Sequence, residues 1–519
     1  MDRSKNIFWA FLLFVIAACQ PDAEEAPPPP AQDSIVWVRD MPLSQTFPSG
    51  GGRTTLSFSS SGPWTASLVE PSIVNWCRIA PTEGVAGEGR MTVTVLPNTT
   101  PAIRTAIVTV RTGKAERSVT LIQQPSDVRV CSEEEVRRFL EKLYRDTDGD
   151  NWRFKDHWCS DRPLSEWGPS VKYADGKLEL ILGENNLRGK IDLSGCTALV
   201  SLRCAKNALT SLDVSGCPLL TQVDCTNCGI AELNLSGCYS LERILCGYND
   251  LTRIDLSDCP YLKSLTTPRN RLNELDISSC SGLDEINCAE NQLKTLDVAG
   301  RQPLRHLFCY GNELTELDLS GCSSLTLLNC GSNRLTELNL SGCRKLGRLY
   351  CYDNRIGTLD LSDCKNELAQ LHCPYNRLSR LDVAAYRRLS QLDCSHNDLR
   401  EMDLSDCVML GTLYCSDNDL HDISLAGCTM LSQFDCSRNS LRSIDVSVCR
   451  HLSRLLCSDN AILSEIPESF DRLTVFEHDI RYEYRTERDE TSGKETTTAI
   501  DRKTGWWYPG EPEKGSHSR

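Results

Sequence analysis

The stretch Leu325-Thr326-Leu327-Leu328-Asn329-Cys330-Gly331-Ser332-Asn333-Arg334-Leu335 decides how this chain folds, because versions of it follow one another along most of the sequence. Together with the residues after it, the stretch reads L-x-x-L-x-C-x-x-N-x-L-x-x-L-D-(L/V)-S-G-C. Thirteen copies recur with a period of 21 residues, the first at Leu199 and the last around Leu452 to Asn460. A fixed period of this length predicts a solenoid, in which each copy forms one coil and buries its apolar side chains against its neighbours.

The pattern matches the leucine-rich-repeat signature, with Cys in the place of the third Leu. Copies of 21 residues with a cysteine in the strand resemble the repeats of bacterial internalins. One copy has 22 residues, with the extra one between Cys364 and Leu368, and a degenerate turn from Leu178 to Leu193 leads in. In each copy we expect a short strand to point Leu and Cys inward and the residues between them toward a concave face.

Two columns of cysteines run along the repeats and, with Cys228, account for 24 of the 28 cysteines. Identical side chains on parallel strands point the same way, so they do not meet as disulfides require. A straight column also does not bring four ligands together around zinc. We therefore expect buried, reduced thiols that act as small apolar residues. The first column is 204, 225, 246, 288, 309, 330, 351, 373, 394, 415, 436 and 457, with Thr267 as its exception; the second is 196, 217, 238, 259, 280, 322, 343, 364, 407, 428 and 449, interrupted by Arg301 and Tyr386.

A column of asparagines follows the strands, and Cys228 occupies one of its positions. Asparagine side chains can satisfy backbone groups where a chain turns, so these residues are expected to be structural. The column is 207, 249, 270, 291, 312, 333, 354, 376, 397, 418, 439 and 460.

The variable positions of the concave face are mostly small or polar, but the central copies depart from this. Phe308 and Tyr350 are expected two strands apart, roughly 10 Å. Exposed aromatic residues grouped with arginine have the composition of binding hot spots, although scattered surface aromatics also occur without function. The predicted ligand-binding patch is His306, Phe308, Tyr310, Arg348, Tyr350, Tyr352, His372, Tyr375 and Tyr414.

The N-terminus predicts an exported, anchored protein. An apolar run from Ile7 to Ala18 is too short to span a bilayer and suits a secretory signal. It ends in Ile16-Ala17-Ala18-Cys19, which resembles the lipobox of bacterial lipoproteins and implies cleavage before Cys19 and acylation of this residue. The acidic, Pro-rich stretch that follows reads as a tether and resembles the surface-export signal of Bacteroidetes lipoproteins. We expect an outer-membrane lipoprotein at the cell surface, with a periplasmic location as the alternative.

Residues 34 to about 125 alternate with the period of strands and predict a small β-sandwich. The stretches Ser61-Gly62-Pro63-Trp64 and Asn75-Trp76-Cys77 resemble the BACON domain of Bacteroidetes secreted proteins, for which the resemblance implies carbohydrate or mucin binding. Trp64 could stack on a sugar. The alternative, which we favour, is that Trp64 and Trp76 are core residues and the domain is a spacer.

Between the sandwich and the repeats, Ser132-Glu133-Glu134-Glu135 predicts a capped amphipathic helix. This segment is expected to cover the first coil, which otherwise has one face without a neighbour. Cys131 and Cys159 could form a disulfide in an oxidising compartment or remain free. At the other end, residues 475 to 486 and 494 to 501 are expected to form two strands of a C-terminal cap.

The expected fold is multidomain: an all-β sandwich followed by a leucine-rich-repeat solenoid, or horseshoe, with caps at both ends. The expected segments are signal peptide 1–18, tether 19–33, sandwich 34–126, N-terminal cap 127–177, solenoid 178–470 and C-terminal cap 471–519.

The net charge of −15 argues against nucleic acid as a partner. Contact with a membrane is expected through the lipid anchor only. No catalytic motif is present, so we expect no enzyme, no catalytic residues, no metal and no cofactor.

The leading functional hypothesis is a surface binding or adhesion protein that recognises a host or microbial protein or glycan through its concave face. The alternatives are an envelope enzyme or its accessory and a purely structural envelope component.

Overall fold

The structure is a computed structural model of the whole chain. It describes residues 33–37, 44–68, 76–96, 98, 103–124 and 130–461, and the backbone of three short strands beyond them. The chain divides between Val128 and Arg129 into two compact units, which are described separately. The signal peptide, tether and Cys19 lie outside the described residues. No helix of the described residues is long and apolar enough to cross a membrane.

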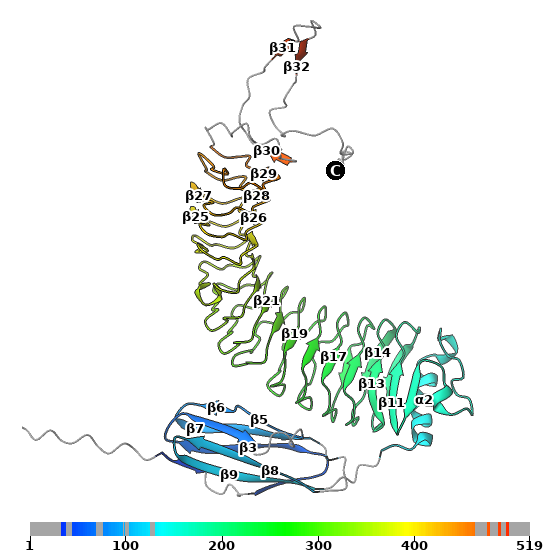
Figure 1. Cartoon of the computed structure of the whole chain (residues 1–519). Helices are drawn as coiled ribbons and strands as arrows, with labels where there is room; N and C mark the ends of the chain where they lie inside the picture. The colour runs from blue at the N-terminus through cyan, green and yellow to red at the C-terminus, as the bar shows by residue number, and fades with distance from the viewer. Residues whose placement is uncertain are drawn as a thin grey trace, which may run out of the picture. The chain divides into compact units, whose positions relative to one another are not determined.

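The first unit is a sandwich of two sheets (Figure 1). The sequence segments with alternating apolar and polar residues form its long strands. The turn at Thr112-Gly113-Lys114 joins β8 to β9, and Gly113 has φ +50° there. One sheet has the order β1-β3-β7-β5 (Ile35–Trp37, Gly52–Ser60, Gly87–Val95, Cys77–Ala80), and the other β2-β9-β8-β4-β6 (Ser44–Phe47, Ala115–Gln123, Arg104–Thr112, Trp64–Leu68, Glu83–Gly84).

Both tryptophans in question are core residues of the sandwich. Trp64 is 4% exposed and meets the ring of Phe58 edge-on at 4.9 Å, while Trp76 is 6% exposed. Gly84 leaves room for Trp64, because a Cβ there would lie 2.6 Å from its ring. Neither ring has an exposed face on which a sugar could stack. The prediction that Trp64 stacks on a sugar is therefore wrong, and both tryptophans are core residues.

The second unit begins with helix α2 (Glu133–Asp146), whose start matches the expected capping signal. The Ser132 hydroxyl accepts from the Glu135 backbone N–H, and the Glu135 carboxylate accepts in return from the Ser132 N–H. The buried face of α2 and three tryptophans share one core with the first coil. That core includes Val136, Leu140, Leu143, Trp152, Trp158, Trp167, Leu178 and Leu180.

The coils then stack so that one strand from each joins a single 16-stranded sheet, here called the long sheet. It is parallel from β11 onward, with β10 added antiparallel at its start. Its strands in spatial order are β10 (Val171–Ala174), β11 (Lys177–Ile181), β13 (Leu199–Arg203), β15 (Gln222–Asp224), β17 (Arg243–Leu245), β18 (Ser264–Thr266), β19 (Glu285–Asn287), β20 (His306–Phe308), β21 (Leu327–Asn329), β22 (Arg348–Tyr350), β23 (Gln370–His372), β24 (Gln391–Asp393), β26 (Thr412–Tyr414), β28 (Gln433–Asp435), β29 (Arg454–Leu456) and β30 (Val475–Glu477).

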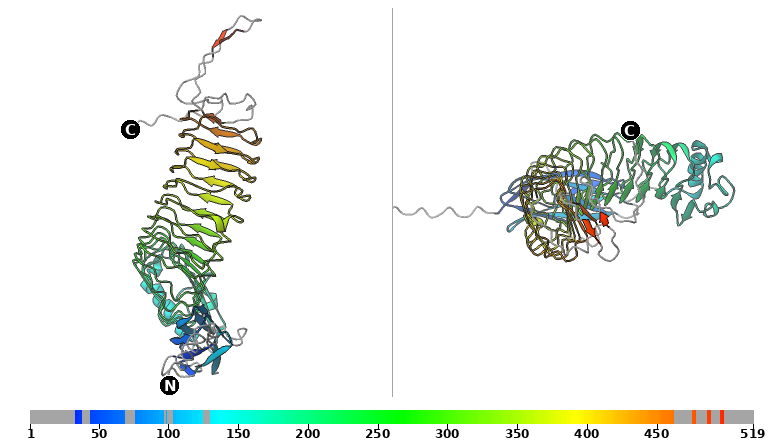
Figure 2. Two further views of the ribbon diagram at one scale, coloured as in Figure 1. Left: turned by 90° about the vertical axis from the view of Figure 1, so that its left-hand side faces the viewer. Right: turned by 90° about the horizontal axis from the view of Figure 1, so that it is seen from above.

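Further strands line the opposite side of the coils. They form the parallel sheets β12-β14-β16 (Arg188–Asp192, Ala208–Asp213, Glu232–Asn234) and β25-β27 (Glu401–Asp403, Asp422–Ser424). In the C-terminal half the coils curve so that β26, β28 and β29 lie on the inner side and β25 and β27 on the outer side (Figure 1). Figure 2 shows the same strands stacked one above another.

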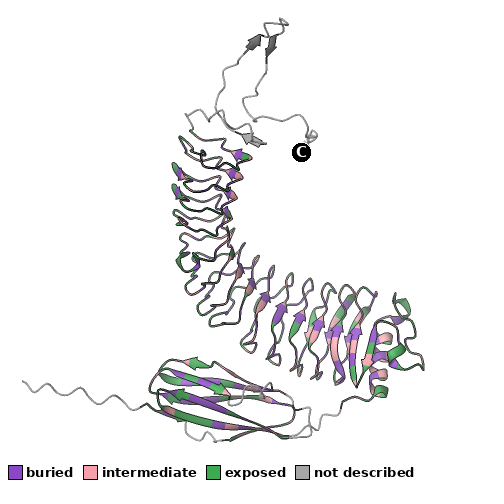
Figure 3. Cartoon of the chain, viewed as in Figure 1, coloured by how far each residue is buried: buried purple, intermediate pink, exposed green. Residues whose placement is uncertain are grey.

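In the long sheet, the middle residue of each strand from β15 to β29 is buried and the flanking residues are more accessible. Figure 3 shows buried and more exposed residues mixed along the stacked strands. Every cysteine of both predicted columns is buried and free, so the expected buried thiols are confirmed. Burial raises the pKa of these thiols, for example that of Cys351 to about 12. They therefore remain protonated and apolar at neutral pH.

The asparagine column ties each coil to the one before it, as expected. Asn291 is typical: its Nδ2 donates to the carbonyls of Cys288 and Ala289 in its own coil and of Thr267 in the preceding coil. Its Oδ1 accepts from the Leu272 N–H at 3.0 Å. One side chain thus satisfies backbone groups that the three-residue strands leave unpaired.

The column has one more member than expected. Buried Asn185, in the lead-in coil, hydrogen-bonds both the N–H and the carbonyl of Phe154 in the N-terminal cap. The asparagine ladder therefore continues into the cap.

Arg301 interrupts the second cysteine column yet uses the same acceptors as a thiol. In regular coils the thiol donates to the carbonyl 24 residues earlier, as Cys322 does to Val298 at 3.2 Å. Arg301 donates likewise to Ile277, at 2.7 Å, and also to Cys280, at 2.8 Å. Its buried Nε, however, has no hydrogen-bond partner, and burial lowers the pKa of the guanidinium.

Of the two alternatives for Cys131 and Cys159, a disulfide or free thiols, the structure has both thiols free. Cys131 precedes α2 and lies beside Gly195 and Thr197 of the first coil. Cys159 instead neighbours Glu141 and Arg145, in the second half of the helix. The two thiols therefore have different surroundings, Cys131 beside the first coil and Cys159 in the turns after α2.

Two of the C-terminal strands pair with each other, β31 (Thr486–Arg488) and β32 (Glu495–Thr497), in an antiparallel ladder. β30, at the start of the expected cap, instead joins the long sheet beside β29. The side chains of this region lie outside the described residues.

Candidate ligand-binding face

We define the sheet face as the outward residues that flank the buried middle position of each strand of the long sheet. The strands are in regular parallel register, so each outward residue has a counterpart directly beside it on the next coil. Neighbouring strands in a sheet lie about 4.8 Å apart. A ligand running along the solenoid would therefore meet side chains at this spacing.

Six of the nine predicted patch residues lie on the strands themselves. Phe308, Tyr350, His372 and Tyr414 occupy the last position of β20, β22, β23 and β26, while His306 and Arg348 occupy the first position of β20 and β22. Asn329 separates Phe308 from Tyr350 in the register. The two rings therefore start two strands apart.

The other three, Tyr310, Tyr352 and Tyr375, lie in the turn just after the strand rather than on it. The strands before these tyrosines have only three residues each, because the turn toward the column asparagine begins at once. Tyr375 sits in that turn with φ 56° and is 56% exposed. These tyrosines therefore line one edge of the sheet face, a distinction that sequence spacing does not reveal.

The patch residues on the strands are already held in place by their neighbours. Tyr350 stacks on His372 with ring centroids 5.0 Å apart, and its hydroxyl donates to Oε1 of Gln370 at 2.6 Å. The Tyr414 hydroxyl donates in the same way to Gln433 at 2.8 Å. Such contacts lower the conformational entropy that the side chains would lose on binding a ligand.

Sequence reasoning missed two residues at the edge. Tyr248 is 49% exposed, and the guanidinium of Arg269 lies 5.1 Å from its ring centroid. His396 stacks on Tyr375 at 4.1 Å, with the two planes 11° apart. The sequence could have indicated Tyr248, because it directly precedes a column asparagine, as Tyr375 does.

A hollow of about 290 Å³ lies at the beginning of the strands β15 to β19 and was also not foreseen. Its charged groups are partly paired, since Lys263 donates to Glu242 at 2.8 Å and Ser264 to Glu285 at 3.3 Å. Polar residues dominate it, and it lacks the aromatic side chains of the predicted patch. Its lining is Thr221, Gln222, Glu242, Arg243, Lys263, Ser264, Asp284 and Glu285.

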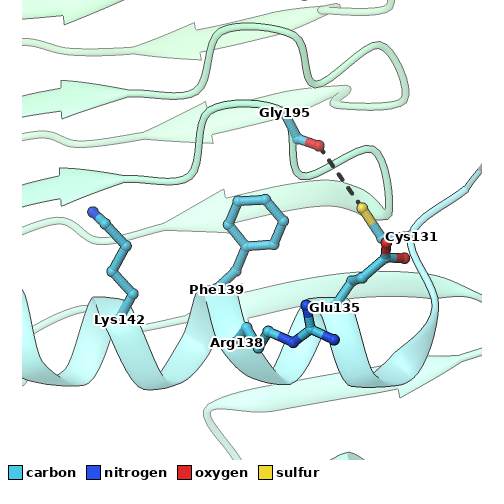
Figure 4. A pocket seen from close by; sticks show the side chains of 6 residues that line it. All are labelled: Cys131, Glu135, Arg138, Phe139, Lys142 and Gly195. Atoms are coloured by element: carbon cyan, nitrogen blue, oxygen red, sulfur yellow. Dashed lines mark hydrogen bonds between the residues drawn. The ribbon is translucent and has the colours of Figure 1, made fainter.

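A larger cavity, of about 410 Å³, lies between α2 and the first coil (Figure 4). Phe139, Arg138 and Lys142 project from the helix, and the Cys131 thiol points to the Gly195 carbonyl at 3.8 Å. The Thr197 hydroxyl donates to the same sulfur at 3.2 Å. This thiol therefore belongs to the packing of the cap against the first coil.

Among the described residues, no group of three or more His, Cys, Asp or Glu side chains could hold a metal ion. The sheet face presents hydrogen-bonding, aromatic and charged side chains in a row. Side chains of these kinds are typical of a ligand-binding surface.

Comparison with known protein families finds a match in the first unit. The model of the BACON family, described as "Putative binding domain, N-terminal", matches residues 66–124. No curated protein matches the chain significantly.

Solved structures similar to the chain include the functional domain of InlJ from Listeria monocytogenes, which includes a cysteine ladder. The identity is 29% over 55% of this chain and 64% of that domain, with a TM-score of 0.46. This chain thus spans less than two thirds of the InlJ domain. The internalin InlF of the same organism is 21% identical over 59% of this chain and 87% of its own, with a TM-score of 0.45.

The leucine-rich effector YopM from Yersinia pestis is 20% identical over 67% of this chain and 99% of its own, with a TM-score of 0.47. The fold expected from the sequence is confirmed: the chain carries a BACON domain followed by a parallel leucine-rich-repeat solenoid resembling those of internalins.

Proposed function

We propose that this protein is a lipid-anchored, cell-surface binding protein that captures a protein or glycan ligand on the sheet face of its solenoid. The observation that carries the proposal is the group of aromatic residues on β20, β22, β23 and the turns beside them. Elsewhere the sheet face is mostly small or polar. Aromatic residues with an adjacent arginine are the side chains that contribute most to recognition surfaces.

The protein is proposed to bind without catalysing a reaction. The matched family is described as a binding domain, and the column thiols are buried with raised pKa values. A thiol that stays protonated is a poor nucleophile.

The test replaces Phe308, Tyr350 and Tyr352 together with alanine in the soluble ectodomain, residues 34–519. We expect the variant to lose ligand capture in pull-downs and glycan arrays while its melting temperature stays within a few degrees of wild type. The matched control replaces Ser201, Asp224 and Thr266 with alanine, because these residues lie on the same face outside the patch. Equal capture by both triple variants would end the proposal.

We propose that the BACON domain acts as a spacer between the anchor and the solenoid. The burial of Trp64 and Trp76 supports this role, because it leaves neither ring available for stacking. Deleting residues 34–126 from the soluble ectodomain should leave ligand capture unchanged. A loss of capture would assign binding to the sandwich.

Anchoring through Cys19 is proposed on the lipobox resemblance, and it has its own test. Cells grown with radiolabelled palmitate should label the wild type, whereas Cys19→Ser should remain unlabelled. Protease added to intact cells then reports surface display, and a protected protein would favour the periplasmic alternative.

A further inference from the structure

The ring of Tyr352 lies flat on the backbone of the neighbouring coil. A Cβ atom built on Gly331 would lie 2.5 Å from Cε1, 2.5 Å from Cζ and 2.7 Å from Cε2 of this ring. A point in the plane of the ring and beyond its tip would be clearly farther from the two Cε atoms than from Cζ. The near-equal distances therefore place Gly331 beneath the face of the ring and not at its edge.

Asn329 fixes both parts of this arrangement. Its Oδ1 accepts from the Gly331 N–H at 3.2 Å, and its side chain lies near the Tyr352 hydroxyl. The ring is half-buried, with one face on glycine. The opposite face of the ring points away from Gly331.

Tyr310 occupies the equivalent position two coils earlier, with Gly331 between them in the same column. The spacing of strands puts the two tyrosines about 10 Å apart along the solenoid. Burial raises the pKa of Tyr310, and the negative charge of Glu290 adds to the effect. Both phenols thus remain neutral at physiological pH.

Planar polar groups accompany the two rings along this edge. Arg269 is paired with Glu290 at 2.8 Å and also covers the ring of Tyr248. Amide, carboxylate and guanidinium groups bind vicinal hydroxyls, because a hydroxyl can donate and accept at once. An aromatic face beside such groups matches a pyranose ring, which has apolar C–H faces and a polar rim.

We propose that Tyr310 and Tyr352 form a stacking platform for an extended, neutral, β-1,4-linked oligosaccharide that runs along the edge of the sheet face. This inference rests on the proposed function and names its ligand class. In an extended β-1,4-linked chain every second sugar presents the same face, at a distance similar to that between the tyrosines. A proline-rich peptide could also stack on aromatic rings, but it lacks the vicinal hydroxyls that the paired polar groups would bind.

The experiment measures binding of cellohexaose, xylohexaose, mannohexaose and chitohexaose to the soluble ectodomain by isothermal titration calorimetry. Maltohexaose serves as the α-linked control and dodecaproline as the peptide control. We expect at least one β-linked hexasaccharide to bind, and maltohexaose to bind at least tenfold more weakly.

Gly331→Ala is the diagnostic variant, because its new Cβ pushes the Tyr352 ring off the backbone while Gly331 itself has no left-handed φ to lose. It should weaken hexasaccharide binding roughly tenfold, which corresponds to the loss of one stacking contact. Gly357→Ala is the matched control, because a Cβ there meets no atom within 4 Å. Tyr352→Phe keeps the ring face and should weaken binding less than Gly331→Ala does.

The inference is overturned if none of the β-linked hexasaccharides binds, or if Gly331→Ala binds as well as Gly357→Ala. Tyr352-dependent binding of dodecaproline in place of the sugars would also overturn it, while leaving the proposed function intact. The proposed function fails separately if the Phe308, Tyr350 and Tyr352 triple variant captures its ligand as well as the wild type.

Discussion

Replacing Asn291 with alanine should destabilise the solenoid by removing one buried hydrogen-bond acceptor. Asn291 is 8% exposed, and its Oδ1 is the acceptor for the N–H of Leu272, which is fully buried. The carbonyls that receive its Nδ2 are less dependent on it, because Asn270 also donates to Thr267 and Asn312 to Cys288. The main loss is therefore the unsatisfied Leu272 N–H.

An unsatisfied buried donor costs about 1–3 kcal/mol, and the weakened carbonyl bonds add to this, so we expect Asn291→Ala to lower the free energy of unfolding by about 2–4 kcal/mol. The control is Asn339→Ala, because Asn339 is exposed and accepts only from the Ser341 N–H of its own turn. That variant should lose only about 0.5 kcal/mol, the low end for a hydrogen bond.

Urea unfolding followed by circular dichroism gives the overall cost, and hydrogen–deuterium exchange of the peptide containing Leu272 gives the local one. Exchange at Leu272 should accelerate in Asn291→Ala and stay unchanged in Asn339→Ala. The chain shows how the reasoning could fail: at Cys228 the Leu209 N–H donates instead to the Cys228 carbonyl, at 3.0 Å. Equal unfolding free energies for the two variants would mean that the backbone can make the same adjustment at Asn291.

Three further predictions concern the thiols and Arg301. When the native protein is treated with iodoacetamide at pH 8, we expect only two of the described cysteines to react: exposed Cys159, and more slowly Cys131. Mass spectrometry identifies the labelled residues. Labelled column thiols in the native protein would contradict their burial. Stability should fall as pH rises from about 9 toward 12, because burial raises the pKa of Cys246, Cys288 and Cys351 from 9.0 to about 12, so the unfolded chain loses these protons first. Each such thiol should lower the free energy of unfolding by about 1.4 kcal/mol per pH unit in that window. Urea unfolding midpoints at pH 8, 9.5 and 10.5 measure this loss. In a control variant with these three cysteines changed to alanine, the midpoint should fall less steeply with pH. Arg301→Cys should restore the cysteine column and remove the unpartnered Nε. We expect the free energy of unfolding to rise by about 1 kcal/mol and the melting temperature by a few degrees. A melting temperature below that of the wild type would show that the arginine contacts stabilise the coil.

The sequence by itself determined the coil. A period of 21 residues with leucine, cysteine and asparagine at constant places leaves little freedom, because each coil must bury the same side chains against an identical neighbour. The burial of both cysteine columns, the structural role of the asparagines and the capped helix at Ser132 could all be predicted for this reason. These features depend on local pattern and on residue type alone.

Only the tertiary structure decided how side chains from different coils meet. The stacking of Tyr350 on His372, of Tyr375 on His396 and of Tyr352 on Gly331 joins residues about one repeat apart. Such contacts depend on register and side-chain rotamers, which a repeat pattern leaves open. The same reason applies to Cys131 and Cys159: the sequence left their pairing open, and the structure has both thiols free.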